Sequence, residues 1–301
     1  MAPERVEVEV GGRTLSLSNL DKVLYPEAGF TKAEVIDYYV RIAPTMLPHI
    51  GDRGITLVRW PNGVEGDSFF SKRCVDHRPD WVPVALGPGH SDGRPIHYCR
   101  LDEVAALAWT ANLAALEVHG PMARHGDIDS PTMVVFDLDP GPGTSIIECA
   151  EVAVLIRDVL DHLGLECWPK TSGSKGLQLY LPLNTPHTHE HASGFAFAVA
   201  QLLEKQHPTQ VVSRMSKDLR HGKVFIDWSQ NSRHKTTIAP YSLRARATPR
   251  VSTPITWHEV ESCAGGEAID FVAREVLERI DALGDLFSPT LTIEQELPVP
   301  G

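Results

Sequence analysis

Two aspartates at the end of a predicted strand are the residues of this chain best suited to catalysis. The apolar run 133–136 is typical of a buried strand and leads into Asp137 and Asp139, before a Pro/Gly cluster at 140–143 ends it. Side chains alternate along a strand, so the two carboxylates point to the same face. Because like charges repel, the pair predicts a hard divalent cation between them. Two solvated turn aspartates are the alternative interpretation, since aspartate is common in turns.

A third acid, Asp227, stands near the end of another short apolar run at 223–228. If the two strands are neighbours, the three carboxylates form a two-metal site for phosphoryl or nucleotidyl transfer, in which the metals clamp the attacking and leaving oxygens. The pattern along the chain leaves the pairing of the strands open.

The loop 172–176 has the composition of a phosphate-binding loop. Its glycines allow close approach of a ligand to the backbone, its serines supply hydroxyls, and Lys175 supplies a charge. It is not a Walker loop, because the GxxxxGK[ST] pattern is absent. A plain Gly/Ser hairpin turn is the alternative interpretation. Further along the chain, Gln230, Lys235 and Arg244 add donors that could face a triphosphate.

The distribution of charge separates one segment from the rest of the chain. The formal net charge is −11, from 28 basic and 39 acidic residues, which taken globally argues against a nucleic-acid-binding protein. Between residues 214 and 250, however, nine cations, Arg220 among them, stand against two acids. An acidic protein with one basic stretch favours a focused groove for a polyphosphate or a nucleic-acid backbone. A solvated charged loop is the alternative.

The elements that must position these residues can be predicted from hydrophobic periodicity and capping residues. The composition, with 42% hydrophobic residues, is that of a globular protein with one large domain or two intertwined subdomains. The patterns predict a hairpin over 6–18, strands over 55–60, 94–101, 165–170, 177–181, 223–228 and 235–243, and helices over 31–50, 102–118, 145–164, 191–205 and 267–283. Because strands outnumber crossover helices, we expect an α+β fold with a mixed, partly antiparallel sheet.

The cysteines and the N-terminus bear on the cellular compartment. Five scattered cysteines form no CxxC pair and predict reduced, buried thiols. The chain has no run of ~18 apolar residues and no apolar signal region at residues 1–5, so we expect a cytoplasmic protein without a membrane span. Three histidines at 187, 189 and 191 could bind a metal, but a polar loop leading into a helix is the favoured interpretation.

Several long motifs resemble one known family. The segments FDLDPGPG (136–143), TSGSKGLQLY (171–180) and KVFIDWSQNSRHKTTIAPYSLR (223–244) closely resemble the polymerase domain of bacterial ligase D. So do SNLDKVLYPEAGFTK (18–32) and RWPNGVEGDSFFSK (59–72), and the resemblance covers roughly residues 15–285. That domain belongs to the archaeo-eukaryotic primase superfamily and serves DNA end joining. The resemblance implies one primase-like α+β domain over 1–301, with an N-terminal subdomain of about 1–130, a catalytic sheet of about 131–250 and a C-terminal helix at about 267–283.

The resemblance also implies an activity and its residues. Family members are metal-dependent primase-polymerases that use nucleoside triphosphates, usually with Mn²⁺ favoured over Mg²⁺, often prefer ribonucleotides, and fill short gaps. The implied catalytic metal ligands are Asp137, Asp139 and Asp227, and the implied nucleotide contacts are Ser172, Lys175, Gln230, Arg244 and, near the sugar hydroxyls, His119. The implied DNA contacts are Asn19, Lys22 and Lys32 for a downstream 5′-phosphate, Phe69 and Phe70 for base stacking, and Arg59 and Arg220. Without the resemblance, His119 would be interpreted as a hydrogen-bonded core histidine, and Asn19 and the two lysines as surface residues. The phenylalanines would be interpreted as core residues, or as strand residues with one ring buried and the other exposed.

Two positions depart from the family pattern. Gln178 stands where the family usually has histidine; it can still form hydrogen bonds but cannot become a cation. Val58 stands before Arg59 where a basic residue is frequent, which weakens the expected DNA contact.

The expected setting is the bacterial cytoplasm, at the nucleoid when the protein is bound to DNA. The expected partners are DNA gaps or ends, a separate DNA ligase and end-binding repair proteins, with the chain either a stand-alone relative or a domain of a larger protein. Three alternative functions stay open: a true primase without gap preference, a haloacid-dehalogenase-type phosphatase, and a non-catalytic DNA-end-binding module. The phosphatase motif requires Thr or Val where Gly141 stands, and the acid triad argues against the non-catalytic module.

Overall fold

The computed structural model describes residues 5–87, 89 and 94–298. The chain forms two compact units, each built from discontinuous segments. The first unit comprises Met1–Pro121, Ile238–Ser252 and Phe271–Gly284, and the second comprises Met122–Thr237, Thr253–Asp270 and Asp285–Gly301. Residues 1–4, on which part of the signal-peptide prediction rests, lie outside the described residues. The prediction of a single functional domain stays a prediction.

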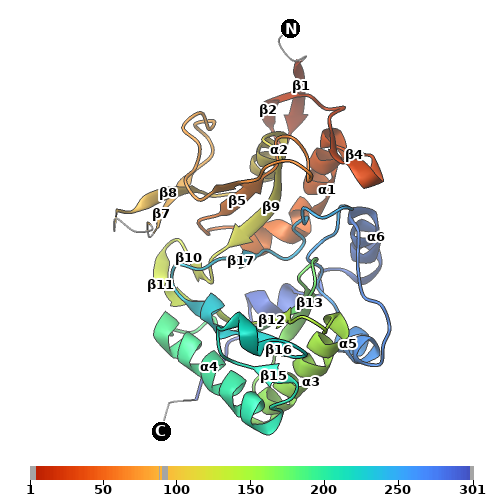
Figure 1. Ribbon diagram of the computed structural model, residues 1–301. Coiled ribbons are helices and arrows are strands. Elements are labelled where there is room, and N and C mark those ends of the chain that lie inside the picture. The colour runs from red at the N-terminus through yellow and green to blue at the C-terminus, as the bar shows by residue number, and fades with distance from the viewer. Residues whose placement is uncertain (1–4, 88, 90–93, 299–301) are drawn as a thin grey trace. The chain divides into compact units, whose positions relative to one another are not determined.

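The first unit contains a four-stranded sheet and two helices that pack on each other (Figure 1). Its strands are β1 (Arg5–Val10), β2 (Arg13–Ser18), β3 (Val23–Tyr25), β4 (Phe30–Thr31), β5 (Thr56–Arg59), β6 (Phe69–Ser71), β7 (Val84–Gly87), β8 (Ile96–Cys99) and β9 (Ala115–Gly120). Its helices are α1 (Lys32–Ile50), α2 (Val104–Asn112) and α6 (Ala273–Leu283), with a 3₁₀ turn at Pro26–Ala28. The four-stranded sheet has the order β17-β9-β5-β6, with β17 at Thr237–Ile238.

The start of α1 follows the predicted capping box. The Thr31 side chain accepts a hydrogen bond from the backbone N–H of Glu34, whose carboxylate accepts one from the backbone N–H of Thr31. The buried face of α1 carries two tyrosines with satisfied hydroxyls: Tyr38 donates to the carbonyl oxygen of Tyr241 at 2.8 Å, and Tyr39 donates to that of Leu116 at 2.7 Å. These bonds link α1 to β9 and to the segment that leads to Arg244.

The second unit is built on a five-stranded sheet of order β13-β14-β12-β16-β15. Its strands are β10 (Ala123–Arg124), β11 (Asp127–Pro131), β12 (Met133–Pro140), β13 (Trp168–Thr171), β14 (Leu177–Pro182), β15 (Val211–Val212) and β16 (Val224–Asp227). Its helices are α3 (Ile146–His162), α4 (His189–Gln206) and α5 (Trp257–Ala264), with 3₁₀ turns at Lys217–Leu219, Trp228–Asn231 and Ser288–Leu291. The β15–β16 pair is parallel and the other pairs of this sheet are antiparallel, which confirms the predicted mixed sheet.

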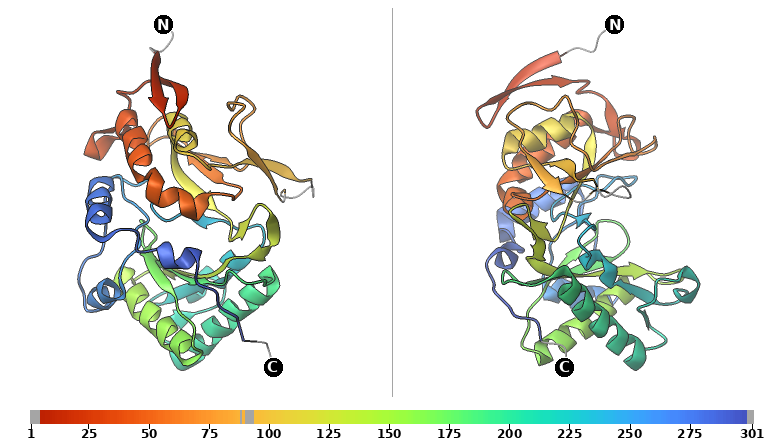
Figure 2. Two further views of the ribbon diagram at one scale, coloured as in Figure 1. Left: turned by 180° about the vertical axis from the view of Figure 1, so that it is seen from behind. Right: turned by 90° about the vertical axis from the view of Figure 1, so that its left-hand side faces the viewer.

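The two faces of this sheet have different surroundings. Helices α3 and α4 lie on one face, as Figure 1 and Figure 2 show. Phe136 faces them, since its ring contacts that of Phe195 in α4 at a centroid distance of 6.5 Å. Val135 lies on the opposite face, in a small cluster with Tyr180 and Phe287. Because side chains alternate, the odd-numbered Asp137 and Asp139 also point away from α3 and α4.

Three of the predicted elements are wrong in extent. The helix predicted over 102–118 ends at Asn112, where Ala114 adopts a positive φ of 57° and strand β9 begins. The strand predicted over 235–243 shrinks to β17, because Pro240 lacks an N–H and Tyr241 has a φ of 66°. The helix predicted over 267–283 begins only at Ala273.

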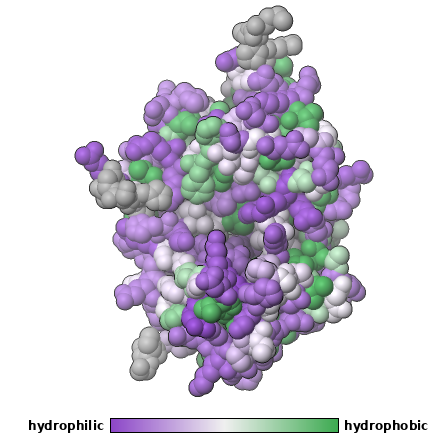
Figure 3. Space-filling model, viewed as in Figure 1, coloured by the Kyte–Doolittle hydropathy of each residue, from purple (hydrophilic) through white to green (hydrophobic). Residues whose placement is uncertain are grey.

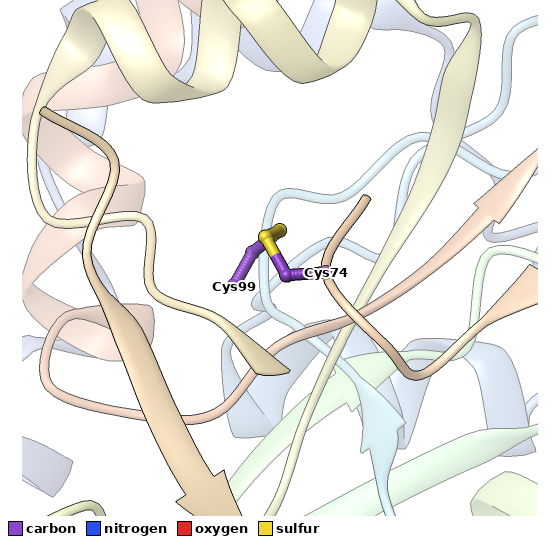
Figure 4. Close-up of a disulfide and its surroundings, with 2 residues drawn as sticks. All are labelled: Cys74 and Cys99. Atoms are coloured by element: carbon purple, nitrogen blue, oxygen red, sulfur yellow. A yellow bond between two sulfur atoms is a disulfide. The ribbon is translucent and has the colours of Figure 1, made fainter. Parts of the chain in front are cut away.

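The prediction of five reduced thiols is also wrong. Cys74, in the loop after β6, forms a disulfide with Cys99 at the end of β8, and the two Cα atoms are 4.7 Å apart (Figure 4). A separation of 25 residues gives no signal in the sequence, because only the folded chain brings the two cysteines together. The remaining cysteines, Cys149, Cys167 and Cys263, are free and buried as predicted.

None of the described helices has both the length and the apolar composition needed to cross a membrane. Hydrophilic residues predominate on the face of the molecule that Figure 3 shows, and the hydrophobic areas on that face are small and scattered.

Candidate active site

The structure brings the three predicted metal ligands to one face of two adjacent strands. Asp137 in β12 lies directly opposite Asp227 in β16, and Asp139 lies opposite Phe225. Directly opposed residues of an antiparallel pair share a face of the sheet. The strand pairing that the sequence left open is therefore present, and the three carboxylates gather on the face away from α3 and α4.

A buried lysine completes a polar row across four strands. In the sheet register Lys170 lies opposite Gln178, Gln178 opposite Asp137, and Asp137 opposite Asp227. Lys170 donates from Nζ to Gln178 Oε1 at 2.6 Å, and Gln178 donates from Nε2 to Asp137 Oδ1 at 3.0 Å. Ammonium groups only donate and carboxylates only accept, so the amide of Gln178 can have only this orientation. Gln178, which departs from the family pattern, therefore contacts the predicted metal ligand Asp137.

Burial and neighbouring acids raise the pKa values of Asp137 and Asp139. Burial, together with the charges of Asp139 and Asp227, raises the pKa of Asp137 to about 7. Burial and Asp227 also raise the pKa of Asp139, while the charge of Arg220 opposes that rise. Like charges gathered in this way favour either protonation or a bound cation. Hard carboxylate oxygens are the ligands that Mg²⁺ and Mn²⁺ prefer, so the residues present fit such an ion.

The three aspartates do not yet converge as a ready ligand set. Among residues 5–87, 89 and 94–298, no group of three or more histidine, cysteine or acidic side chains could hold a metal ion as it stands. A cation at the acids therefore requires the aspartate side chains to adjust.

The histidine segment 187–191 matches the favoured interpretation of a polar loop that leads into a helix. His189 forms hydrogen bonds with the carbonyl oxygens of Asn231 and Ile128, whereas His187 and His191 contact each other.

Asp227 is held by the residues that follow it. Its Oδ1 accepts hydrogen bonds from the backbone N–H of Ser229 at 3.0 Å and from the Ser229 hydroxyl at 2.6 Å, and its Oδ2 accepts one from Gln230 Nε2 at 2.9 Å. Gln230, an expected triphosphate contact, thus orients a carboxylate in this structure. The buried Asn231 bonds both backbone groups of Val135 and so ties the 3₁₀ turn to β12.

Arg220, an expected DNA contact, lies close to the acids. Its guanidinium carbon is 3.7 Å from the ring centre of Phe225, the residue opposite Asp139, and Nη2 donates to the carbonyl oxygen of Met215 at 2.8 Å. Its charge opposes the rise in the pKa of Asp139 that burial and Asp227 cause. The Arg220 side chain therefore already contacts Phe225 and Met215 of the second unit.

The loop 172–176 is a tight turn between the paired strands β13 and β14. Ser172 Oγ accepts hydrogen bonds from the backbone N–H groups of Ser174 and Gly176, so this hydroxyl organises the turn. Gly176 is required there, because a Cβ at this position would lie 1.9 Å from the carbonyl oxygen of Leu138. Lys175 is exposed at the tip. The geometry is that of a hairpin turn, and phosphate binding by Ser172 and Lys175 stays a prediction.

In the first unit, one buried acid joins two of the expected nucleotide contacts. Glu117 Oε2 lies 2.9 Å from Nε2 of His119, and Oε1 lies 3.2 Å from Nε of Arg244 in an ion pair. Oε1 also accepts a hydrogen bond from the backbone N–H of Ala245 at 3.1 Å. Although burial opposes ionisation, the hydrogen bond from His119 and the charge of Arg244 lower the pKa of Glu117. The structure therefore brings His119 and Arg244 together through a residue that the sequence analysis missed.

Phe69 and Phe70 are both on the surface. They lie in the edge strand β6 with exposed fractions of 56% and 59%, so both alternatives, two core residues or one buried and one exposed ring, are wrong. The ring of Phe70 is 6.4 Å from that of His119. Two exposed aromatic rings on a strand edge are suited to stacking on bases. Neighbouring Arg59 donates to the carbonyl oxygen of Leu113 at 3.0 Å, at the C-terminus of α2.

Asn19, Lys22 and Lys32 gather at the N-terminus of α1. Lys22 Nζ donates to Asn62 Oδ1 at 3.1 Å, Lys32 Nζ donates to the carbonyl oxygen of Ser18 at 2.6 Å, and the Lys32 N–H donates to the carbonyl oxygen of Lys22 at 2.8 Å. Burial and the charge of Lys22 lower the pKa of Lys32 to about 8. Two amines beside a helix N-terminus form a site suited to an anion.

Comparison with known proteins identifies the family. The family model described as "LigD, primase-polymerase domain" matches residues 31–287. The chain belongs to this family. Its sequence is 48% identical over 275 residues to the multifunctional non-homologous end joining protein LigD of Mycolicibacterium smegmatis, covering 91% of this chain. The corresponding protein of Mycobacterium tuberculosis is 46% identical over 283 residues, covering 89% of this chain. The predicted resemblance is thereby confirmed.

A solved structure of the same family confirms the fold. The polymerase domain of Mycobacterium tuberculosis ligase D, in complex with DNA, superimposes with a TM-score of 0.86 at 45% identity, covering 92% of this chain and 98% of that one. The predicted α+β, primase-like fold class is correct. The chain spans 35% and 37% of the lengths of the two mycobacterial LigD proteins.

Within this LigD primase-polymerase framework, sequence reasoning missed two buried charged residues. Lys170 and Glu117 lie in short strands, with exposed fractions of 0% and 6%. A charged residue within an otherwise apolar strand is the signal that could have found both, because such residues are almost never fully buried unless they are paired. For Glu117 that signal was hidden, since the segment was predicted to be helical.

Proposed function

We propose that this chain is a metal-dependent nucleotidyltransferase that adds nucleotides, preferentially ribonucleotides, to a 3′ end of DNA at short gaps or breaks. The observation that carries the proposal is the gathering of Asp137, Asp139 and Asp227 on one face of two paired strands. Membership of the LigD primase-polymerase family supports it. A phosphatase or a non-catalytic end-binding module has no comparable support.

In this proposal the three aspartates hold Mn²⁺ or Mg²⁺. A bound ion would lower the pKa of the attacking hydroxyl and neutralise charge that develops during phosphoryl transfer. The chain's own contribution is to orient the carboxylates: Gln178 fixes one oxygen of Asp137, and Ser229 and Gln230 fix both oxygens of Asp227. These bonds hold the carboxylates on one face of the sheet, and the side chains would still have to adjust to bind a cation.

The proposed contacts to the nucleoside triphosphate are drawn from each unit in turn. In the second unit they are Ser172, Lys175 and Gln230, and in the first unit they are Arg244 for phosphate and His119 for the sugar hydroxyls. The exposed Lys175 and the ion-paired Arg244 supply positive charge for phosphate oxygens. A hydrogen bond between His119 and a 2′-hydroxyl would favour ribonucleotides over deoxyribonucleotides.

DNA binding is proposed to use the first unit at two places. Asn19, Lys22 and Lys32 would bind a downstream 5′-phosphate, and the exposed Phe69 and Phe70 would stack on bases. Arg59 and Arg220 are proposed to contact the DNA backbone. The names of the mycobacterial relatives and the solved complex of a related polymerase domain with DNA support a role at DNA ends. A separate DNA ligase and end-binding repair proteins are the proposed partners. We place this activity in the cytoplasm, at the nucleoid.

Extension of a gapped duplex tests the proposal. The substrate carries a 3′-hydroxyl primer and a downstream 5′-phosphate, and it is incubated with Mn²⁺ and either ribonucleotides or deoxyribonucleotides. We expect templated addition that is faster with ribonucleotides and stronger on the 5′-phosphorylated gap than on its 5′-hydroxyl counterpart. Asp137→Asn is the matched inactive control. Synthesis on single-stranded template without a primer, at an equal rate, would instead favour a true primase, and absence of any nucleotide addition would contradict the proposal.

A further inference from the structure

Glu117 is almost fully buried, which is rare for a glutamate. It lies in β9, its side chain is 8% exposed, and it has a basic partner for each carboxylate oxygen. His119 is two residues further along the same strand, so both side chains share one face of the sheet. Arg244 comes from a segment far along the chain. One buried carboxylate thus contacts both residues.

The chemistry of the pair decides where the protons lie on His119. An ionised carboxylate only accepts hydrogen bonds, so Nε2 of His119 must carry a hydrogen when it faces Glu117 at 2.9 Å. A neutral imidazole has one N–H group, and its lone pair must then lie on Nδ1. Any hydrogen bond that the neutral ring accepts is therefore accepted at Nδ1.

The same carboxylate determines the position of Arg244. Oε1 contacts Nε of Arg244 at 3.2 Å and accepts the backbone N–H of the next residue, Ala245, at 3.1 Å. The ion pair is thus made at the Nε side of the guanidinium group of Arg244. Tyr25 adds a hydrogen bond to the carbonyl oxygen of Arg244 at 3.1 Å. Side chain and backbone at this position are thus both held.

Two buried tyrosines, Tyr25 and Tyr39, also interact with Glu117, and burial raises the pKa of both above the ordinary value. They are therefore neutral at physiological pH. Arg244 supplies the positive charge that Glu117 balances.

We propose that Glu117 is a positioning residue for the nucleotide: it sets the tautomer of His119 and holds the guanidinium group of Arg244. The inference rests on the proposed nucleotidyltransferase function, in which these two residues contact the sugar and the phosphates. With the lone pair on Nδ1, His119 can accept a hydrogen bond from a sugar hydroxyl. The ligand that this arrangement selects is a nucleoside triphosphate whose sugar presents a hydroxyl donor.

A spectroscopic test reads the tautomer directly, without any substrate. Two-bond ¹⁵N–¹H correlation spectra of ¹⁵N-histidine-labelled protein distinguish Nε2–H from Nδ1–H, and the spectrum of His119→Gln assigns the signal. We expect Nε2–H only in the wild-type protein. In Glu117→Gln, either amide atom can face the ring, so both tautomers should be populated. Detection of Nδ1–H in the wild-type neutral ring would overturn the inference.

A kinetic test separates positioning from a structural role. Glu117→Gln should raise the KM for ATP about tenfold with a smaller change in kcat, because ground-state contacts are lost. The preference for ATP over dATP should also fall. Glu117→Asp, which retains a carboxylate, should recover part of the loss. The control Glu103→Gln breaks another Glu–Arg pair of the same unit, with Arg13 at 3.2 Å, and should change neither KM nor preference.

The outcomes distinguish this inference from the proposed function. If the wild-type protein adds no nucleotides but has the Nε2–H tautomer that is lost in Glu117→Gln, the proposed function fails while the control of His119 by Glu117 stands. If the wild-type protein is active, and Glu117→Gln retains both the tautomer and the KM, the positioning role is refuted. If Glu117→Gln does not fold, Glu117→Asp supports the inference by a raised KM and refutes it by an unchanged one.

Discussion

Carboxylates occupy opposite electrostatic situations in two regions of the molecule. The acid row of the second unit consists of Asp137, Asp139 and Asp227, and the Glu117 group of the first unit consists of Glu117, His119 and Arg244. Asp137 lies beside two other acids, and burial with their charges raises its pKa to about 7. Glu117 is also buried, but the contacts with His119 and Arg244 lower its pKa. Burial alone therefore does not decide the charge state of a carboxyl group, because the charges of its neighbours determine whether its pKa rises or falls. The acid row is arranged to receive cations from outside, whereas the Glu117 group is neutralised by the chain itself.

The largest expected effect is on catalysis and tests the first half of this contrast. Asp137→Asn or Asp227→Asn removes a proposed metal ligand, so nucleotide addition should fall to the background of the reaction without enzyme. DNA binding should persist, since the proposed phosphate contacts lie elsewhere. Primer extension and a binding assay on the same gapped duplex measure both quantities. Near wild-type extension by either variant would rule out the metal-ligand assignment.

The next effect is on stability, and substitutions in the two regions should change the melting temperature in opposite directions. In metal-free buffer at pH 8, Asp137→Asn should raise the melting temperature because it removes a charge that its neighbours repel. Glu117→Gln should lower it, because it leaves Arg244 without its ion partner, a loss of ~1–3 kcal/mol. Each kcal/mol corresponds to roughly 2–4 °C for a domain of this size. A change of the same sign in both variants would remove the contrast.

The pH dependence of stability follows from the same pKa directions. The folded protein binds a proton at Asp137 more tightly than the unfolded chain does, so this group's contribution becomes unfavourable as pH rises from about 4 to about 7. Glu117 has a lowered pKa, so its contribution is present above the unfolded pKa of ~4.3 and is lost as pH falls below it. Melting temperatures of the two variants and the wild-type protein, measured across this range without metal, should show the two profiles.

A smaller effect concerns nucleotide affinity and compares two cations. Lys175→Ala and Arg244→Ala each remove a proposed contact to the triphosphate worth ~1.5–3 kcal/mol, so the KM for nucleotide should rise roughly tenfold to a hundredfold. Only Arg244→Ala should also destabilise the fold, because Lys175 is exposed and Arg244 balances a buried acid. Steady-state kinetics and thermal melts of both variants measure this. Unchanged KM values in both would exclude these roles.

The smallest effect concerns the lysine pair at α1, where cations rather than anions gather. The pKa of Lys32 is lowered to about 8, and a 5′-phosphate binds the protonated form, so the preference for a phosphorylated gap should weaken as pH rises through 8. The double change Lys22→Ala/Lys32→Ala should abolish the preference and spare extension of a simple overhang. Binding to 5′-phosphate and 5′-hydroxyl gaps at fixed salt measures it. A wild-type preference that is independent of pH would contradict the role of Lys32.

Local patterns were sufficient to predict the elements that carry the acids. The apolar run before Asp137, the capping boxes at Thr31 and Ser145, and the Pro/Gly stops predicted β12, α1 and α3 closely. These features depend on residues within one or two turns of each other. The family motifs are equally local, which explains why the family was predictable from the sequence.

The charged side chains within the strands depended on pairing that local patterns do not contain. Residues 115–118 were predicted to be helical, yet they pair with β5, some sixty residues earlier in the chain, and this pairing places Glu117 beside His119. Likewise, the register of three strands places Gln178 opposite both Lys170 and Asp137. Tertiary contacts can override local propensity, because burial across a sheet outweighs the small preferences of single residues.

The sequence by itself predicted the acids proposed as metal ligands, the main helices, the mixed sheet and the family. Only the tertiary structure decided that Asp137 and Asp227 are opposed, that Cys74 bonds Cys99, and that Glu117 balances His119 and Arg244. Each of these pairs joins distant segments or depends on a strand register. The physical reason is that a residue type fixes its charge and hydrogen-bonding capacity, whereas the sign of a pKa shift depends on neighbours that only folding supplies.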